Sequence, residues 1–388
     1  MTLIFSKHFW LQRKVVGLGE WRNSMSICMS GRYQLGLQKA AQVIDKEYLQ
    51  NRSILITGAT GLIGSAIVDL LLWMNKHYAL GVLVYAASRD ISKVYDRFKP
   101  FSAEDGLFAI KYDALQKICF DFHVDYIIHA ASNANPEEYI TYPVDTMLGN
   151  IIGIRELLEY AKCIGAKKTI YVSSSEVYGI RSGTTAIKEN EYGYVNLLNS
   201  RSSYAMGKRA TETLCISYAK QYGCNVSIVR PGHIYGPTAQ NTDHRVVSEF
   251  ARLVAQEKDI VLKSEGTQIR SYCHCLDCAT AILTVLNKGK PAEAYNISNK
   301  DSVITIRQMA ELLASYGKVK LLFDLPTKSE REAFNPMENS SLDSERLEQL
   351  GWYGVFDPEE GFENTVTAMK EILGSSSVSQ MENGAAIL

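Results

Sequence analysis

The chain has 388 residues, of which 46% are hydrophobic and 21% are charged, a globular composition that is long enough for one large domain or two unequal ones. The formal net charge of -1 and the lack of any long run of one charge argue against nucleic acid as a partner. No apolar stretch approaches the roughly 18 residues of a membrane helix, and Lys7, Arg13 and Lys14 interrupt any signal-peptide core; we expect a cytoplasmic protein that does not span a membrane.

The eight cysteines are scattered along a chain too large to need disulfides for stability, so we expect reduced thiols that pack as small hydrophobic side chains. Residues 273–278, Cys-His-Cys-Leu-Asp-Cys, contain the residue types of a metal site. Part of this run alternates as a strand does, however, and no second pair of ligands follows at a useful spacing. Packing at a strand-to-helix junction is therefore favoured over metal binding, and we expect no metal.

Residues 1–30 show no sustained periodicity, and Met25 or Met29 could equally be the first residue, so this part is interpreted as an N-terminal extension of uncertain status. A helical pattern covers residues 33–49. Short apolar runs then alternate with helical stretches: strands are expected at 54–57, 81–87, 126–130, 169–173 and 226–230, and helices at 64–74, 144–164 and 205–222.

Strict alternation of helices with strands that are apolar on both faces predicts a parallel sheet covered on two sides, a doubly wound α/β (Rossmann) fold. Residues 31–230 are expected to form mainly this dinucleotide-binding domain. From residue 231 Gly and Pro become frequent and the elements shorter. We expect residues 231–373 to form mainly a smaller substrate-binding lobe, with strands that could return to the sheet, and residues 374–388 to be a disordered, Ser- and Gly-rich tail.

A glycine-spaced turn joins the first expected strand to its helix. Gly58 permits the tight turn, Gly61 lets backbone N–H groups approach a pyrophosphate, and Gly64 lets helix and strand pack closely. Such a triplet alone is weak evidence, but here it follows a strand and opens an apolar helix in an alternating pattern. Dinucleotide binding is therefore favoured over a simple turn, with contacts from Gly58, Thr60, Gly61, Leu62, Ile63 and Gly64.

The end of the second strand should meet the adenosine ribose of the cofactor. If Ser88 occupies that position, its small hydroxyl and the guanidinium of Arg89 favour the 2′-phosphate of NADP, whereas a register that brings Asp90 there favours NAD. Arg89 could also be an ordinary surface charge. We lean towards NADP, and expect Asp113 near the adenine and Ala130 and Ala131 along the cofactor's path.

The chemistry is expected where the strand at residues 169–173 ends. Tyr204 and Lys208 are four residues apart on a predicted helix, so the ammonium can lie beside the phenol and, with the positive charge of the cofactor, lower its pKa from near 10. The Ser174 hydroxyl could hold a substrate hydroxyl against Tyr204 while a hydride leaves. A Tyr and a Lys at this spacing also occur on ordinary amphipathic helices, so the preceding serine run and nucleotide fold support the catalytic interpretation.

Taken together, these residues resemble the extended short-chain dehydrogenase/reductase family, in its sugar-nucleotide epimerase, dehydratase and decarboxylase branch. The resemblance covers about residues 50–370. It is carried by the three glycines, Ser174, Tyr204 and Lys208, and by segments 129–132 (His-Ala-Ala-Ser), 230–237 (Arg-Pro-Gly-His-Ile-Tyr-Gly-Pro), 266–272 (Gly-Thr-Gln-Ile-Arg-Ser-Tyr) and 350–352 (Leu-Gly-Trp). It implies a nicotinamide cofactor, a sugar-nucleotide substrate and a homodimer.

Segments 132–143 and 245–250 resemble the UDP-glucuronate decarboxylases more than other members of this branch. Where 4,6-dehydratases usually carry an acidic Asp this chain has Ser175, which weakens the dehydratase interpretation, while Glu176 could position the sugar or act as acid or base. The sequence departs from the family pattern at Ser174 in place of Thr, at His233 in place of Asn near the diphosphate, and in lacking an acidic residue around Ser88.

By this resemblance, oxidation of the sugar at C4 gives a 4-keto intermediate, and a C5 carboxylate would then leave as carbon dioxide; 4-epimerisation and 4,6-dehydration are the alternatives. Arg245 and Arg270 are expected to bind the diphosphate through their guanidinium groups, or to be surface ion-pair residues, with His233 and Val246 also in the substrate site. A non-catalytic nucleotide-binding regulator is a further hypothesis, against which the intact Ser174, Tyr204 and Lys208 set argues.

Overall fold

The computed structural model describes residues 26–132, 134, 136–181, 183–325 and 337–384. Its centre is a sheet of seven strands in the order β10-β6-β5-β4-β1-β2-β3, and every neighbouring pair is parallel. The strands are β1 (Ser53–Thr57), β2 (Leu83–Ser88), β3 (Leu107–Lys111), β4 (Tyr126–His129), β5 (Lys168–Val172), β6 (Val226–Pro231) and β10 (Ala294–Ile297).

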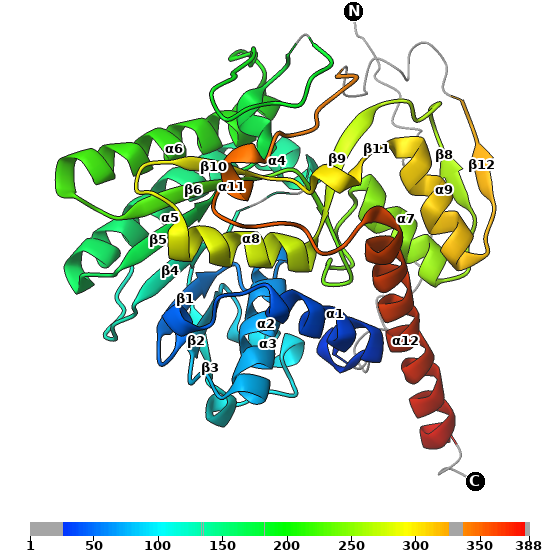
Figure 1. Ribbon diagram of the computed structural model, residues 1–388, viewed down its shortest axis with the longest axis horizontal. Helices are drawn as coiled ribbons and strands as arrows, with labels where there is room; N and C mark the ends of the chain where they lie inside the picture. The colour runs from blue at the N-terminus through cyan, green and yellow to red at the C-terminus, as the bar shows by residue number, and fades with distance from the viewer. Residues whose placement is uncertain (1–25, 133, 135, 182, 326–336, 385–388) are drawn as a thin grey trace, which may run out of the picture.

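Helices cover both faces of this sheet, as Figure 1 shows. One layer contains α2 (Leu62–Tyr78), α3 (Ile91–Arg97) and α8 (Cys275–Lys288), and the opposite layer contains α5 (Pro143–Ile164) and α6 (Ser203–Tyr222). The strands are buried on both faces because both helix layers pack on them, which explains their unbroken apolar runs. The predicted doubly wound α/β fold is confirmed.

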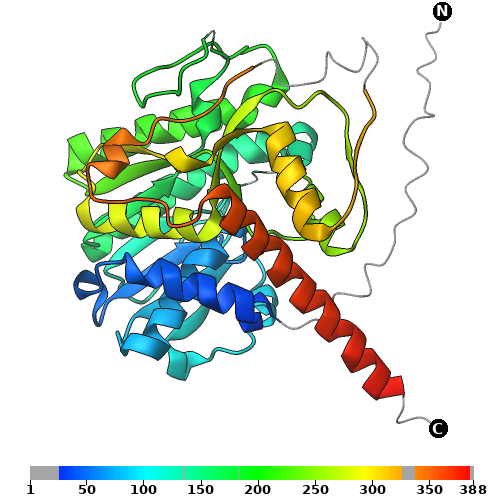
Figure 2. The same ribbon diagram turned by 45° about the vertical axis from the view of Figure 1, so that its right-hand side comes forward.

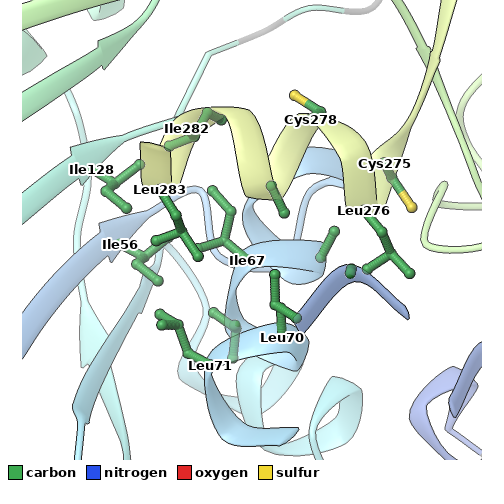
Figure 3. Close-up of a cluster of buried hydrophobic side chains, with 14 of the residues drawn as sticks. Ile56, Ile67, Leu70, Leu71, Ile128, Cys275, Leu276, Cys278, Ile282 and Leu283 are labelled. Atoms are coloured by element: carbon green, nitrogen blue, oxygen red, sulfur yellow. The ribbon is translucent and has the colours of Figure 1, made fainter. Parts of the chain in front are cut away.

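The main hydrophobic core lies between the sheet and the layer of α2 and α8. Figure 3 shows Ile67, Leu70 and Leu71 of α2 facing Leu276 and Leu283 of α8, with strand side chains beside them. Cys275 and Cys278 belong to the same cluster and are fully buried. Residues 273–278 therefore form the junction of β9 (Ile269–His274) and α8, as the sequence favoured.

The N-terminal part of the described chain packs onto this domain. Residues 27–29 form a short 3-10 turn with Cys28 buried, and Ser30 caps helix α1 (Gly31–Gln42). The packed structure thus begins inside the segment interpreted as an extension. The predicted helix over 33–49 ends early at Gln42, because Asp45 accepts the Glu47 N–H and starts a separate 3-10 turn over Glu47–Leu49.

The remaining elements form a smaller lobe at the carboxyl ends of the strands (Figure 1). Its helices α7 (Val246–Ala255), α9 (Ile306–Gly317) and α12 (Pro358–Gly384) share a second hydrophobic cluster that includes Tyr235, Phe250, Leu313 and Phe362. The strands of the lobe are β7 (His233–Tyr235), β8 (Ile260–Leu262), β9, β11 (Val303–Thr305) and β12 (Leu321–Phe323). Two short helices, α4 (Pro136–Thr141) and α11 (Glu345–Glu348), lie elsewhere in the molecule.

Helix α12 crosses from the lobe past α1 and continues away from the body of the molecule, as Figure 2 shows. The sequence predicted disorder from residue 374, but α12 runs on to Gly384. No proline interrupts residues 374–384, so a helix that is already nucleated and packed can extend through the Ser-rich stretch. The expectation of disorder, made from composition, is therefore wrong for residues 374–384.

Candidate functional site

The glycine turn joins β1 to α2 at the carboxyl edge of the sheet. Gly58 has a φ of +70°, and a Cβ at that position would lie 2.7 Å from the Ala131 nitrogen. A Cβ on Gly64 would lie 2.2 Å from the Gly58 oxygen. Both positions therefore require glycine, the first for the left-handed turn and the second for close packing of helix on strand.

The N-terminus of α2 fits the pyrophosphate of a dinucleotide. Gly61 is the N-cap and provides no side chain to bond the free N–H groups of the first turn, which include those of Leu62 and Ile63. Those N–H groups and the positive end of the helix dipole favour an anion. Two lobe residues brace the turn: Thr238 Oγ1 donates to the Leu62 oxygen at 2.9 Å and Gln240 Nε2 to the Thr60 oxygen at 2.8 Å.

The three residues considered for contact with the adenosine ribose lie in different environments at the end of β2. Ser88 is the last residue of β2 and half-buried, Arg89 is exposed, and Asp90 is the N-cap of α3. The Asp90 carboxylate accepts from the Ser92 backbone N–H at 3.0 Å and from the Ser92 hydroxyl at 2.6 Å, and these bonds lower the pKa of Asp90. This carboxylate is thus already used to start a helix.

Strand β3 lies next to β2, and β4 lies next to β1. The carboxyl ends of β3 and β4 are therefore at the same edge of the sheet as the glycine turn. Asp113 follows β3, is half-buried and accepts the Leu115 N–H at 3.0 Å. Ala130 and Ala131 follow β4, directly against Gly58. The residues expected around the adenine and along the cofactor thus line one continuous edge with the glycine turn.

Ser174, Ser175 and Glu176 follow β5 at this edge. Ser174 caps the 3-10 turn Ser175–Tyr178 by accepting the Glu176 N–H at 3.2 Å. Ser174 and Ser175 are half-buried, whereas Glu176 is exposed. The Ser174 side chain also lies close enough to the Tyr204 phenol to lower its pKa.

Tyr204 and Lys208 lie on the first two turns of α6 and are almost completely buried. The Lys208 Nζ lies 5.8 Å from the centre of the Tyr204 ring and donates to the Val172 carbonyl at 2.9 Å. Burial raises the pKa of Tyr204 to about 12, although the nearby Ser174 side chain opposes this, and burial lowers the pKa of Lys208 to about 7. In the free protein the phenol is therefore protonated at neutral pH.

Tyr139 is a site residue that the sequence reasoning did not select. It is buried in α4, and its ring stacks on the Tyr204 ring with centres 5.1 Å apart and planes 18° apart. The Arg201 guanidinium, three residues before Tyr204, lies 6.0 Å from the centre of the Tyr139 ring and opposes the rise in its pKa that burial causes. No motif marks this contact, because the pairing of α4 with the start of α6 depends on the tertiary fold.

The lobe brings His233 and Arg270 together on the paired strands β7 and β9. Arg270 is buried, and its hydrogen bonds to described residues go to backbone oxygens alone, those of Ile269 at 2.8 Å and Met337 at 3.3 Å. Burial, with the charges of Arg270 and Arg245, lowers the pKa of His233 to about 3. A buried guanidinium without a carboxylate partner among the described residues, beside a neutral imidazole, suits an anionic ligand.

Arg245 and Val246 begin α7 on the other side of the site. Arg245 forms a two-bond ion pair with Asp243, with Nη2 to Oδ2 at 2.5 Å and Nε to Oδ1 at 2.9 Å. Val246 is half exposed. The Arg245 charge acts on both Tyr204 and His233, so it lies close to the site while bound to its own carboxylate.

Three findings concern features raised by the sequence. All eight cysteines are free thiols. No group of three or more His, Cys, Asp or Glu side chains in the described part of the chain could hold a metal ion. Within the same residues, no helix is both long enough and apolar enough to cross a bilayer.

Comparison with known proteins agrees with this geometry. Residues 54–298 match the model of the NAD dependent epimerase/dehydratase family. The chain is 30% identical over 313 residues to UDP-glucuronic acid decarboxylase 6 of Arabidopsis thaliana, covering 79% of this chain and 85% of the relative. It is 26% identical to dTDP-D-glucose 4,6-dehydratase of Mus musculus, covering 81% of this chain and 88% of that protein.

Solved structures give the same relationship. The crystal structure of UDP-glucose 4-epimerase of Thermotoga maritima with UDP-glucose superposes with a TM-score of 0.67 and 25% identity, covering 83% of this chain and 99% of that chain. The family match spans more than half of the chain and includes both the glycine turn and the Tyr204 helix. The protein therefore belongs to the NAD dependent epimerase/dehydratase family, whose curated members similar to it are sugar-nucleotide enzymes.

Proposed function

We propose that this protein decarboxylates UDP-glucuronate through a 4-keto intermediate and releases a UDP-pentose. The observation that carries the proposal is the arrangement of Ser174, Tyr204 and Lys208 beside the glycine turn, in a chain that is similar to UDP-glucuronic acid decarboxylases over most of its length. Ser175 supports the same choice, because a hydroxyl cannot supply the proton that expulsion of a C6 hydroxyl requires.

The first step assigned to the protein is removal of the C4 hydroxyl proton. Tyr204 as phenolate would accept this proton, the neighbouring Ser174 hydroxyl would share it, and the Lys208 charge would stabilise the phenolate. A bound nicotinamide dinucleotide would supply a positive charge and hydride chemistry at C4. Gly58, Gly61 and Gly64, with Ala130 and Ala131, are the residues that would hold it.

The second step follows from the chemistry of the ketone. With C4 oxidised, the carboxylate on C5 is that of a β-keto acid, so the C5–C6 bond breaks, carbon dioxide leaves and the electron pair enters the enolate. A proton from solvent then adds to C5, and restoration of the C4 hydride, with the Tyr204 proton going back to O4, gives the pentose. Arg270 and His233 would hold the diphosphate, with Arg245 and Val246 at its border, and Glu176 would position the sugar.

Product analysis tests this proposal against its rivals. The purified protein is incubated with NAD⁺ or NADP⁺ and, separately, with UDP-glucuronate, UDP-glucose and dTDP-glucose. We expect a nucleotide product lighter by one carbon dioxide from UDP-glucuronate alone. A product of unchanged mass would instead indicate a 4-epimerase, loss of water a 4,6-dehydratase, and cofactor binding without turnover on the panel a regulatory protein.

We infer a preference for NADP over NAD as cofactor. It is supported by the use of the Asp90 carboxylate as a helix cap, which leaves Ser88 and the exposed Arg89 to meet the 2′-position. Replacing Arg89 with Gln should weaken NADP⁺ binding about tenfold and leave NAD⁺ binding unchanged, as measured by titration of the protein with each nucleotide. Tighter binding of NAD⁺ by the unmodified protein would contradict this preference.

We also propose a cytoplasmic homodimer. Exposed apolar side chains on the adjacent helices α5 and α6, among them Val144, Leu148 and Ile216, support self-association through this layer. The free thiols suit a reducing compartment. Light scattering during gel filtration should give twice the 43.3 kDa chain mass, and a monomer at micromolar concentration would contradict the dimer.

A further inference from the structure

The Lys208 ammonium is buried, and no carboxylate among the described residues forms an ion pair with it. Its side chain is 1% exposed, and its hydrogen bond goes to the neutral Val172 carbonyl at 2.9 Å. The carboxylate one helical turn further on, Glu212, pairs instead with Arg230, with Nη2 and Oε2 2.6 Å apart. Some other group must therefore offset the loss of water around this charge.

The face of the Tyr171 ring is that group. The Lys208 Nζ lies 4.8 Å from the centre of this ring, closer than the 5.8 Å to the Tyr204 ring. Tyr171 is fully buried in β5 and precedes Val172, so two consecutive residues provide the ring face and the carbonyl. An aromatic face carries a negative quadrupole, and its attraction for a cation is strongest where water is excluded.

A fixed support holds the ring in this position. The His129 ring stacks on Tyr171 with centres 5.9 Å apart and planes 28° apart, and His129 Nδ1 is bonded to Thr57 Oγ1 at 2.7 Å. Burial, together with the Lys208 charge, lowers the pKa of His129 to about 3, so the imidazole is neutral and adds no competing charge. Strands β1, β4 and β5 thus fix the ring that faces the ammonium.

We propose that Tyr171 is a positioning residue, whose ring face keeps Lys208 in its charged form beside Tyr204. The role of that charge in the reaction rests on the proposed function, but the protonation state of Lys208 does not. The hydroxyl of Tyr171 plays no part in this role, so phenylalanine should serve equally well at this position.

The groups that face Lys208 determine the direction of the effect. Burial lowers its pKa to about 7, while Glu212 and Cys215 on α6 act in the opposite direction. The other titratable neighbours are Tyr204 on the same helix, Tyr171 on β5 and His129 on β4. Removing the aromatic face should lower the pKa of Lys208 further, so that the ammonium loses its proton at a lower pH.

The test is an NMR titration of the substrate-free protein labelled with ¹³C at the lysine Cε carbons, in which the Lys208 signal is identified by its absence from Lys208→Arg. We expect Tyr171→Phe to titrate like the unmodified protein and Tyr171→Leu to titrate about one pH unit lower. An unchanged midpoint in Tyr171→Leu would overturn the proposal, and so would an equal shift in Tyr171→Phe.

A second experiment measures the pH dependence of enzyme activity. On the substrate that supports turnover, the alkaline limb of the kcat profile should move to lower pH in Tyr171→Leu and return to its original position in Tyr171→Phe. If the leucine variant does not fold, incorporation of a ring-fluorinated tyrosine at position 171 weakens the quadrupole and keeps the shape, and should also lower the titration midpoint. Failure of UDP-glucuronate as a substrate leaves the NMR result decisive.

Discussion

Tyr204 and Lys208 are held inside the protein, and burial shifts their pKa values in opposite directions, each towards the neutral form. A reaction that needs the phenolate and the ammonium must therefore work against burial. Ser174 opposes burial at Tyr204, the Tyr171 ring is proposed to oppose it at Lys208, and the positive charge of a bound nicotinamide would favour the phenolate. The reactivity of this pair thus depends on its immediate neighbours.

Replacing Tyr204 with Phe should reduce kcat by about a hundredfold to ten-thousandfold, because the group that accepts the C4 proton is lost. Binding of the nicotinamide cofactor, measured by fluorescence titration, should remain. Tyr218→Phe, which changes another phenol of the same helix, provides the matched control and should keep its activity. Undiminished turnover in Tyr204→Phe would remove the phenol from the mechanism.

Arg270 offers a test of substrate binding. Within the part of the chain that the structure describes, its buried guanidinium donates to backbone oxygens alone, so we expect Arg270→Gln to raise the KM for the sugar nucleotide about tenfold or more. Arg307→Gln removes an exposed arginine that pairs with Glu311 and should leave KM unchanged. Equal KM values in the two variants would contradict diphosphate binding by Arg270.

The sequence predicted those site residues that belong to local motifs. The glycine turn and the Tyr204–Lys208 spacing each lie within one strand-turn-helix unit or one helix, where periodicity determines which side chains meet. Tyr139, Tyr171 and Thr238 were missed because each acts across elements distant in sequence. The ion pair of Arg245 with Asp243 also could not be distinguished from diphosphate binding by sequence alone.

Among secondary-structure elements, those with long and regular apolar runs were predicted best. Short elements, whose bounds depend on tertiary packing, were predicted worst. Strands β1, β2, β4, β5 and β6 and helices α2, α5 and α6 were expected within about four residues of their observed bounds, because their apolar runs are long and regular. Strands β3 and β10 and helices α3 and α8 of the same sheet domain were not predicted. The three-residue strands of the lobe, such as β7 and β8, were not predicted. Strands this short carry too few residues for a period to be recognised.

The glycine turn gives a prediction at this scale. A Cβ on Gly64 would lie 2.2 Å from the Gly58 oxygen, so Gly64→Ala should lower the free energy of unfolding by about 1–3 kcal/mol and weaken cofactor binding. The control is Gly149→Ala in α5, where nothing lies within 4 Å of the added Cβ; it should stabilise by about 0.5–1 kcal/mol. Chemical denaturation measures both, and equal effects would contradict the close approach.

At the scale of the whole molecule, α1 and α12 join the Rossmann domain to the lobe. Helix α1 packs on α2 and α8, and its residues Arg32 and Lys39 form ion pairs with Glu363 and Glu360 of α12. Helix α12 in turn packs against α7, which begins at Arg245. The terminal segments therefore connect the cofactor domain to the helix that borders the substrate site.

Buried histidines should make the whole fold sensitive to acid. Burial lowers the pKa of His274 to about 3, so the folded state keeps it neutral while the unfolded state protonates it below about 6.5. Its contribution to stability is complete above pH 6.5 and is lost as the pH falls towards 3. Burial raises the pKa of Asp277 to about 7, so its contribution to stability depends on pH in the opposite way. That contribution is present below the unfolded-state pKa of about 3.9 and is lost as the pH rises towards 7.

His274→Asn isolates this effect, because asparagine can still cap α8 as His274 does. Between pH 6 and pH 4 the unfolding free energy of this variant should fall less steeply than that of the unmodified protein, by up to about 1.4 kcal/mol per pH unit. Exposed His244 provides the control variant, His244→Asn. Parallel pH dependence in all three proteins would show that His274 titrates normally in the fold.

The central claim is that the sugar is oxidised and reduced again at C4 within one active site. Its most direct test is the mass spectrum of the nucleotide product formed from UDP-glucuronate that carries deuterium at C4. We predict a UDP-pentose that has lost one carbon dioxide and retains the deuterium, since the hydride taken from C4 is returned there. A product without the label, or a substrate recovered unchanged with either cofactor, would contradict the account.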